Sequence, residues 1–223
     1  RLGKIPIIAL TIGPGGSIIL VHSMNVVLAT APETWLSKMY LPSLGLLYMA
    51  KALEDAGFPV TVSDATIDGF EQEGIEAQVN AILAKDPGVV GFTGNTHNRF
   101  NVLKAVSLIR QKAPKVVTVV GGPHFGLSHV AEDTMKHTTD IDAVCVGEGE
   151  YAMRDLCLKV QSGSLDFTGI PGMVWKNEKR ETIKNTESRL LPPDDLDRLG
   201  MPSWHLIDHT KFHSTLEGGV EGT

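Results

Sequence analysis

The chain has few cysteines, few aromatic residues and no cluster of positive charge. Cys145 and Cys157 are the only cysteines among its 223 residues. They are too few and wrongly spaced for a disulfide framework or a zinc site, and their apolar neighbours predict two buried thiols. The formal net charge is −6, and no more than two Lys or Arg residues are consecutive. This balance argues against a nucleic-acid-binding surface.

Long apolar runs are also missing. Residues 5–12 and 17–21 are apolar, but a Gly-Pro-Gly-Gly sequence at 13–16 separates them. Each run is far shorter than the ~20 residues that a membrane-spanning helix needs, and a signal peptide would need a longer apolar stretch. With 42% apolar residues, the composition is typical of a soluble cytoplasmic protein with one sizeable core, and no membrane partner is expected.

Two glycine-rich sequences each follow a run of β-branched and apolar residues. Gly-Gly-Pro-His at 121–124 follows the run 116–120, and Gly-Glu-Gly-Glu at 147–150 follows the run 141–146. A helix-length segment separates them, which is typical of parallel strands whose turns share one edge of a sheet. Ligands bind at that carboxyl edge in open α/β sheets, because glycine lets the backbone approach a ligand closely. The two turns therefore predict a binding site at this edge.

The apolar pattern predicts five repeats of a strand followed by a helix within residues 24–162. The expected strands are 26–29, 60–62, 89–92, 116–120 and 141–146, and the expected helices are 43–57, 75–83, 102–109, 128–136 and 150–160. These repeats predict an α/β, flavodoxin-like (Rossmann-type) fold with a five-stranded parallel sheet covered on both faces. Right-handed crossovers favour the strand order 2-1-3-4-5.

Three segments flank this expected domain. Residues 1–23 are a leader, either an extension or a two-stranded hairpin, and the sequence leaves both open. Residues 163–190 hold an expected β-hairpin, formed by 172–176 and 181–184, that lies outside the parallel sheet. Residues 191–223 are rich in proline and acidic residues, which predicts a linker toward another domain of a longer protein.

Several motifs occur in a set order between residues 24 and 210. They are Leu-Pro-Ser-Leu-Gly-Leu at 41–46, Val-Val-Gly-Phe-Thr at 89–93, Gly-Gly-Pro-His at 121–124 and Asp-Ala-Val-Cys-Val-Gly-Glu-Gly-Glu at 142–150, followed by the hairpin and residues 196–208. In this order they resemble the N-terminal cobalamin-binding domain of cobalamin-dependent radical SAM enzymes. That family includes many methyltransferases and the anaerobic magnesium-protoporphyrin monomethyl ester cyclases.

The resemblance implies cobalamin as the cofactor. Mutase-type domains supply an axial histidine from Asp-x-His-x-x-Gly after the first strand, but no histidine occurs in this chain between His22 and His97. The resemblance therefore implies base-off cobalamin without a histidine from that loop. The Cys-x3-Cys-x2-Cys motif of radical SAM enzymes is absent from these residues. We therefore expect this chain to be a fragment of a longer parent protein with a radical SAM domain. That missing domain, and not this fragment alone, would hold a [4Fe-4S] cluster and S-adenosylmethionine and carry out the reaction, for which methyl transfer is the first expectation.

The resemblance also implies which residues contact the corrinoid. They lie at the start of the first helix, in the turn after the third strand and in the two glycine-rich turns: Pro42, Leu44, Gly45, Thr93, Gly94, Asn95, Thr96, His97, Gly121, Gly122, Pro123, His124, Gly147, Glu148, Gly149 and Glu150. No catalytic residue or metal ligand is among them. His97 is expected to border the corrin without coordinating cobalt. Gly122→Val and Gly149→Val are both expected to abolish corrinoid uptake, and both proteins are expected to stay folded if these turns serve mainly the ligand.

Two of these assignments have alternatives. His124 contacts the cobalamin or bonds only to neighbouring backbone. Glu148 and Glu150 accept hydrogen bonds from a ribose or a corrin amide, or they favour the positive N-terminus of the following helix.

Other functional classes fit less well. A receiver domain needs an acidic pair after the first strand and an aspartate ending the third, where this chain has Thr30, Ala31 and Thr93. A dinucleotide-binding enzyme needs Gly-x-Gly-x-x-Gly directly after the first strand, but the Gly-Pro-Gly-Gly sequence lies upstream of it. A degenerate flavodoxin-like domain that serves as an interaction module without corrinoid is the alternative that the sequence leaves open.

Overall fold

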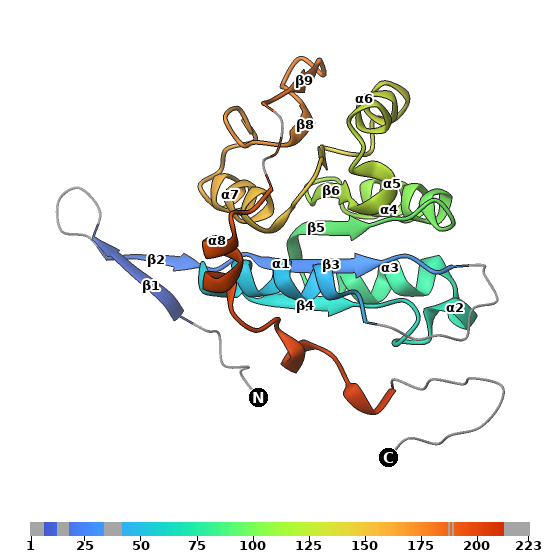
Figure 1. Ribbon diagram of the computed structural model, residues 1–223, viewed down its shortest axis with the longest axis horizontal. Coiled ribbons are helices and arrows are strands. Elements are labelled where there is room, and N and C mark those ends of the chain that lie inside the picture. The colour runs from blue at the N-terminus through green and yellow to red at the C-terminus, as the bar shows by residue number, and fades with distance from the viewer. Residues whose placement is uncertain (1–6, 13–17, 34–41, 187, 189, 212–223) are drawn as a thin grey trace.

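The computed structural model describes residues 7–12, 18–33, 42–186, 188 and 190–211 (Figure 1). Its strands are β1 (Ile7–Ile12), β2 (Ile18–His22), β3 (Asn25–Thr30), β4 (Val60–Ser63), β5 (Pro87–Thr93), β6 (Val117–Gly121), β7 (Ala143–Cys145), β8 (Met173–Lys176) and β9 (Thr182–Lys184). Its helices are α1 (Leu44–Asp55), α2 (Phe70–Glu73), α3 (Ile75–Leu83), α4 (Arg99–Lys112), α5 (Gly122–Phe125), α6 (Ser128–His137), α7 (Glu150–Gln161) and α8 (Pro193–Leu199), with 3-10 helices η1 (Trp204–Leu206) and η2 (His209–Lys211). Trp35 and Tyr40, in the loop after the first expected strand, lie outside the described residues.

The five expected strands form the parallel core of the sheet. Its order is β4-β3-β5-β6-β7, and all four pairings between these neighbours are parallel. Counted from the first of the five, this is the predicted order 2-1-3-4-5, so the predicted fold class is confirmed. The order reverses between β3 and β5, and the carboxyl ends of the strands at such a reversal are where ligands bind in open α/β sheets.

The predicted hairpin exists, but its predicted place outside the sheet is wrong. β8 pairs antiparallel with β7, and β9 pairs with β8, so the sheet has seven strands. Met173, Val174 and Trp175 are all buried, although successive residues of a strand point to opposite faces. A strand that is apolar on both faces must lie inside a layered fold, and in this sheet it covers the edge that β7 would otherwise expose.

Two layers of helices cover the sheet, as Figure 1 shows in outline. On one face, α1 and α7 pack over alternate strand residues such as Leu28, Val119 and Cys145. On the other face, α3, α4, α5 and α6 pack over the residues between them, such as Ala29 and Val120. This alternation explains why the parallel strands are continuous apolar runs. Because α1 and α7 cover the same face and each follows a strand of the parallel core, their first turns lie together at the carboxyl edge.

The flanking segments are structured as well. β1 and β2 pair antiparallel, the arrangement of a hairpin, and in Figure 1 they project from the seven-stranded sheet. In the C-terminal segment, Ser203 Oγ and His205 Nε2 both bond to the carboxylate of Glu54 on α1, at 2.5 and 2.8 Å. The segment that follows the hairpin therefore packs against α1. Within the described ranges, no helix is long and apolar enough to cross a membrane.

Candidate functional site

A crevice opens at the carboxyl edge of the sheet, between α1 and α7. Its volume is about 340 Å³. The first turns of the two helices line it, together with the ends of β5, β6 and β7. Much of its wall is glycine backbone or the flexible thioether side chains of Met49 and Met153. An apolar crevice with few polar groups, at the reversal of strand order, is the usual form of a ligand site in this fold.

The turns after β5 and β6 are locked together by backbone hydrogen bonds. The N–H of Gly94 donates to the carbonyl of Gly121, and the N–H of His124 donates to the carbonyl of Gly94, both at 2.9 Å. Gly122 has a φ of +88°, and a Cβ there would lie 2.9 Å from the backbone nitrogen of Gly94. Glycine at 122 is therefore required by the fold itself, because no side chain fits between the two turns.

A second, more polar cavity of about 270 Å³ adjoins the crevice over the ends of β3, β4 and β5. The two cavities share Ser43, Thr93 and Pro123. The polar cavity also has Thr30, Glu33, Asp64 and Asn95 in its wall. The side-chain amide of Asn95 donates to Glu33, so these two polar groups are held together across the reversal of strand order.

The loop after β5 is held by its own asparagines. Asn95 Oδ1 accepts hydrogen bonds from the backbone N–H groups of His97 and Asn98, at 2.8 and 3.1 Å. Asn98 Oδ1 accepts from the N–H of Asn95 at 2.9 Å, while its Nδ2 donates to the carbonyl of Ala31. Both amide oxygens therefore accept hydrogen bonds from the backbone of this loop. The His97 side chain is exposed.

Burial changes the acidity of several groups at this edge. It raises the pKa of the Cys145 thiol to about 12, with the nearby Glu150 carboxyl adding to the effect, so the thiol is neutral and no nucleophile. Burial also raises the pKa of Glu150, with a smaller contribution from the charge of Glu148. The pKa of His124 is lowered by partial burial and by the charge of Arg99. Its ring lies 3.4 Å from Thr96 Oγ1 and edge-on to Phe125.

The crevice brings together nine of the sixteen residues expected at the site: Gly45, Thr93, Gly121, Gly122, Pro123, Gly147, Glu148, Gly149 and Glu150. Asn95 lines the adjoining polar cavity instead. The other six line neither cavity: Pro42, Leu44, Gly94, Thr96, His97 and His124. Gly94 is buried beneath the ring of Phe125, whereas Leu44 and His97 are exposed around the edge.

The comparison with protein families identifies the family of this domain. The family described as B12 binding domain matches residues 36–157, a stretch that contains α1, the parallel strands β4 to β7 and both glycine-rich turns. This chain belongs to the B12-binding domain family.

Relatives and a solved structure agree with this assignment. An uncharacterized methyltransferase of Pyrococcus horikoshii is 28% identical over 172 residues, which are 77% of this chain and 35% of that protein. The anaerobic magnesium-protoporphyrin IX monomethyl ester cyclase of a Synechocystis strain is 27% identical over 177 residues, or 78% of this chain and 34% of that protein. The chain therefore spans about a third of the length of these relatives, and the family resemblance found in its motifs is confirmed.

The fold is also that of a domain in the cobalamin-dependent S-adenosylmethionine radical enzyme OxsB, solved with aqua-cobalamin and S-adenosylmethionine bound. The TM-score is 0.64 at 18% identity, over 76% of this chain and 23% of that one. At this identity the likeness shows the fold. Together with the family match, it supports cobalamin as the cofactor of this B12-binding domain, as predicted from the motifs.

Sequence reasoning missed half of the crevice of this B12-binding domain. The missed lining residues are Ser43, Leu46, Met49, Gly91, Phe92, Val119, Val120, Cys145 and Met153. Most are ordinary core residues at the ends of the strands and on the first turns of α1 and α7, where the crevice lies. Gly91 carried a usable signal, because a glycine inside an apolar strand marks a close approach of backbone to another group.

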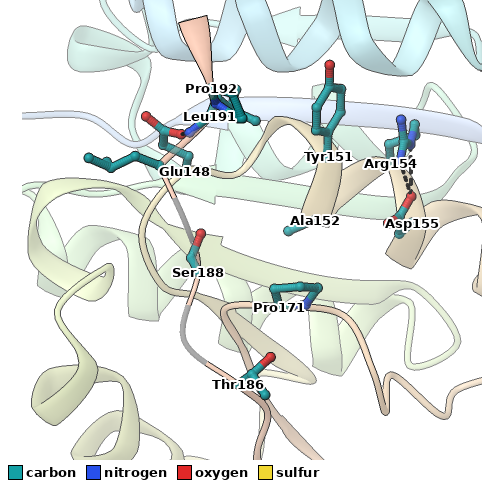
Figure 2. Close-up of a pocket in the computed structure, with 11 residues that line it drawn as sticks. Glu148, Tyr151, Ala152, Arg154, Asp155, Pro171, Thr186, Ser188, Leu191 and Pro192 are labelled. Atoms are coloured by element: carbon teal, nitrogen blue, oxygen red, sulfur yellow. Dashed lines mark hydrogen bonds and ion pairs between the residues drawn. The ribbon is translucent and has the colours of Figure 1, made fainter. Parts of the chain in front are cut away.

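A larger cavity is lined by residues of α7 and, from the C-terminal segment, by Thr186, Ser188 and residues 190–192, and Figure 2 shows its lining. Its volume is about 760 Å³. Arg154 there is paired with Asp155 at 2.7 Å and lies over the ring of Tyr151. Glu148 lines both this cavity and the crevice, and its carboxylate accepts a hydrogen bond from the backbone N–H of Leu191. Glu148 therefore holds the C-terminal segment, a role that neither sequence interpretation included.

Proposed function

We propose that this B12-binding domain holds base-off cobalamin, with no histidine on cobalt, for a longer radical SAM enzyme whose reaction is methyl transfer. The observation that carries the proposal is the pair of adjoining cavities at the carboxyl edge. One is an apolar crevice and the other is polar. A cofactor with a wide polar ring and a detachable nucleotide tail needs two such compartments.

The residues present fit the two parts of this cofactor. The crevice walls at Gly121 and Gly149 have no side chain, so a ligand can contact their backbone closely. One carboxyl oxygen of Glu150 is buried there without a partner. The crevice would hold the nucleotide tail, while Thr93, Asn95 and Glu33 would lie under the corrin. When bound, cobalamin supplies a cobalt centre able to carry a methyl group.

The lower face of cobalt is proposed to have no histidine ligand. The loop after β3 contains no histidine, since none occurs between His22 and His97. His97 lies in the loop after β5 with its side chain exposed, and we expect it to contact or border the corrin without coordinating cobalt.

The proposed function makes a simple binding prediction. Purified protein mixed with hydroxocobalamin and passed through a desalting column should retain corrin absorbance, with the spectrum of the base-off form. Bovine serum albumin treated in the same way is the control for non-specific retention. Loss of all corrin absorbance on desalting would favour the alternative, a degenerate domain that serves for interaction only.

Cob(II)alamin bound to this protein should give an electron paramagnetic resonance spectrum without nitrogen superhyperfine splitting. The reason is that neither the detached base nor His97 is expected on cobalt. His97→Ala should leave the spectrum unchanged. A triplet splitting that disappears in His97→Ala would instead make His97 the axial ligand, and a splitting that persists in this variant would mean that the base is still attached.

A further inference from the structure

One buried carboxyl oxygen in the crevice has no hydrogen-bond partner. Glu150 is the first residue of α7 and lines the crevice. Its Oε2 is buried and unpaired, as are Gln78 Oε1 and Arg110 Nε elsewhere in the described part of the chain. Of these three atoms, only that of Glu150 belongs to a residue of the crevice. Buried polar atoms are nearly always paired, so an unpaired one in a ligand site points to a partner on the ligand.

The other polar side chains of the crevice are less suited to this task. The carboxylate of Glu148 already accepts a hydrogen bond from the backbone N–H of Leu191. The neutral thiol of Cys145 is only a weak donor. Ser43 and Thr93 lie where the crevice meets the polar cavity. Glu150 is therefore the carboxyl group available to a ligand in the apolar part of the crevice, next to the movable side chains of Met49 and Met153.

Glu150 also retains a proton more readily than an exposed glutamate. Burial raises its pKa, and the charge of Glu148 adds to this, while the backbone N–H groups of Gly149 and Glu150 act in the opposite direction. The thiol of Cys145, which also interacts with Glu150, stays neutral. A neutral carboxyl group can donate a hydrogen bond as well as accept one, which an ionised group cannot do.

The detached tail of cobalamin presents a matching group. Its lower base is a flat aromatic ring system with one imidazole-type nitrogen that no longer binds cobalt when the base is off. This nitrogen has a free lone pair, and burying it unpaired in an apolar crevice is unfavourable. Resting on the proposed function, we propose that Glu150 forms a hydrogen bond with this freed nitrogen. A single proton lies between the carboxyl oxygen and the nitrogen, whichever of the two holds it.

This contact would do two things. It would stabilise the base-off form, because the nitrogen exchanges its bond to cobalt for a hydrogen bond to Glu150. It would also make the domain selective among corrinoids by their lower base, since a tail without this nitrogen leaves Glu150 unpaired.

The test compares two corrinoids on three proteins. Dissociation constants for cobalamin and for cobinamide, which has no nucleotide tail, are measured by equilibrium dialysis for the wild type, Glu150→Leu and Glu150→Gln. Glu150→Leu should weaken cobalamin binding roughly tenfold to hundredfold and change cobinamide binding by less than about twofold. Glu150→Gln should retain most of the cobalamin affinity, because its amide can still donate to the nitrogen. Glu76→Gln changes an exposed carboxyl group on α3 that pairs with Lys112 and lines neither cavity, so it should leave both dissociation constants unchanged.

The outcomes separate the two proposals. A wild-type protein that binds neither corrinoid would overturn the proposed function. A wild type that binds both, with Glu150→Leu weakening both equally or neither, would overturn the role of Glu150 alone. Should Glu150→Leu fail to fold, the wild type is compared on cobalamin and on a cobamide whose lower base is a phenol. Roughly tenfold weaker binding of the phenolic form is expected, and equal affinity would overturn the inference.

Discussion

Gly149→Val should sharply reduce retention of cobalamin while leaving the protein folded. A Cβ at residue 149 would lie 2.7 Å from Cε of Met49 and 3.5 Å from Sγ of Cys145. The backbone has a φ of −102°, which any residue adopts, and the end of Met49 can move aside. The valine side chain would then stand inside the crevice, and we expect cobalamin affinity to fall roughly tenfold to hundredfold.

The control for this variant is Gln111→Val. Gln111 is exposed near the end of α4, before β6 begins, and so belongs to the opposite edge of the sheet. It adds the same side chain to a helix without touching the crevice, and cobalamin retention should be unchanged. Both variants are assessed by circular dichroism before desalting with hydroxocobalamin. Full retention by folded Gly149→Val protein would place the ligand elsewhere.

Gly122→Ala should destabilise the protein by about 2–4 kcal/mol, whether or not a ligand is present. The positive φ disfavours any side chain, and the Cβ would lie 2.9 and 3.1 Å from the backbone nitrogen and oxygen of Gly94. These two atoms cannot move aside, because both are hydrogen-bonded to the turn after β6. The expectation that Gly122→Val stays folded is therefore not supported, and Gly149 is the better residue for testing the ligand.

Gly121→Ala is the matched control for this prediction. Gly121 has an extended backbone with a φ of −164°, and its Cβ would meet only the carbonyl oxygen and Cβ of Cys145, at 3.3 and 3.5 Å. We expect a change within about 1 kcal/mol. The free energy of unfolding in urea measures both variants. Equal losses for the two adjacent glycines would mean that the positive φ and the contact with Gly94 are not what makes residue 122 sensitive.

The helices and strands of the core were predictable because their signals are local. Apolar spacing placed α3 and α6 within a residue or two of their observed ends, and β-branched runs placed β3 to β7. α5 was missed, since Gly-Gly-Pro-His at 121–124 has the composition of a turn and forms a single helical turn only when locked against Gly94. α8 was missed for a similar reason: it begins at Pro193 in a segment without helical periodicity.

The candidate site was predictable in part. Glycine at the end of a parallel strand marks the ligand edge in any sequence of this kind, which is why both glycine-rich turns were found. The apolar half of the crevice was not, because Leu46, Val119 and Met153 have the pattern of ordinary core residues. Different roles for Glu148 and Glu150 could not be foreseen either, as the two are equivalent in the motif and differ only in what surrounds them.

The sequence by itself determined most of the core helices and strands, the order of the parallel strands and the cofactor, because each depends on short-range pattern or on motif order. Only the tertiary structure decided that β8 and β9 extend the sheet and that α1 and α7 enclose a crevice. It also decided that Glu148 accepts a hydrogen bond from Leu191, whereas Glu150 has a buried oxygen without a partner. These features depend on contacts between distant residues, such as Glu148 with Leu191 and Gly149 with Met49. No local pattern encodes such contacts, since they arise only when the layers pack together.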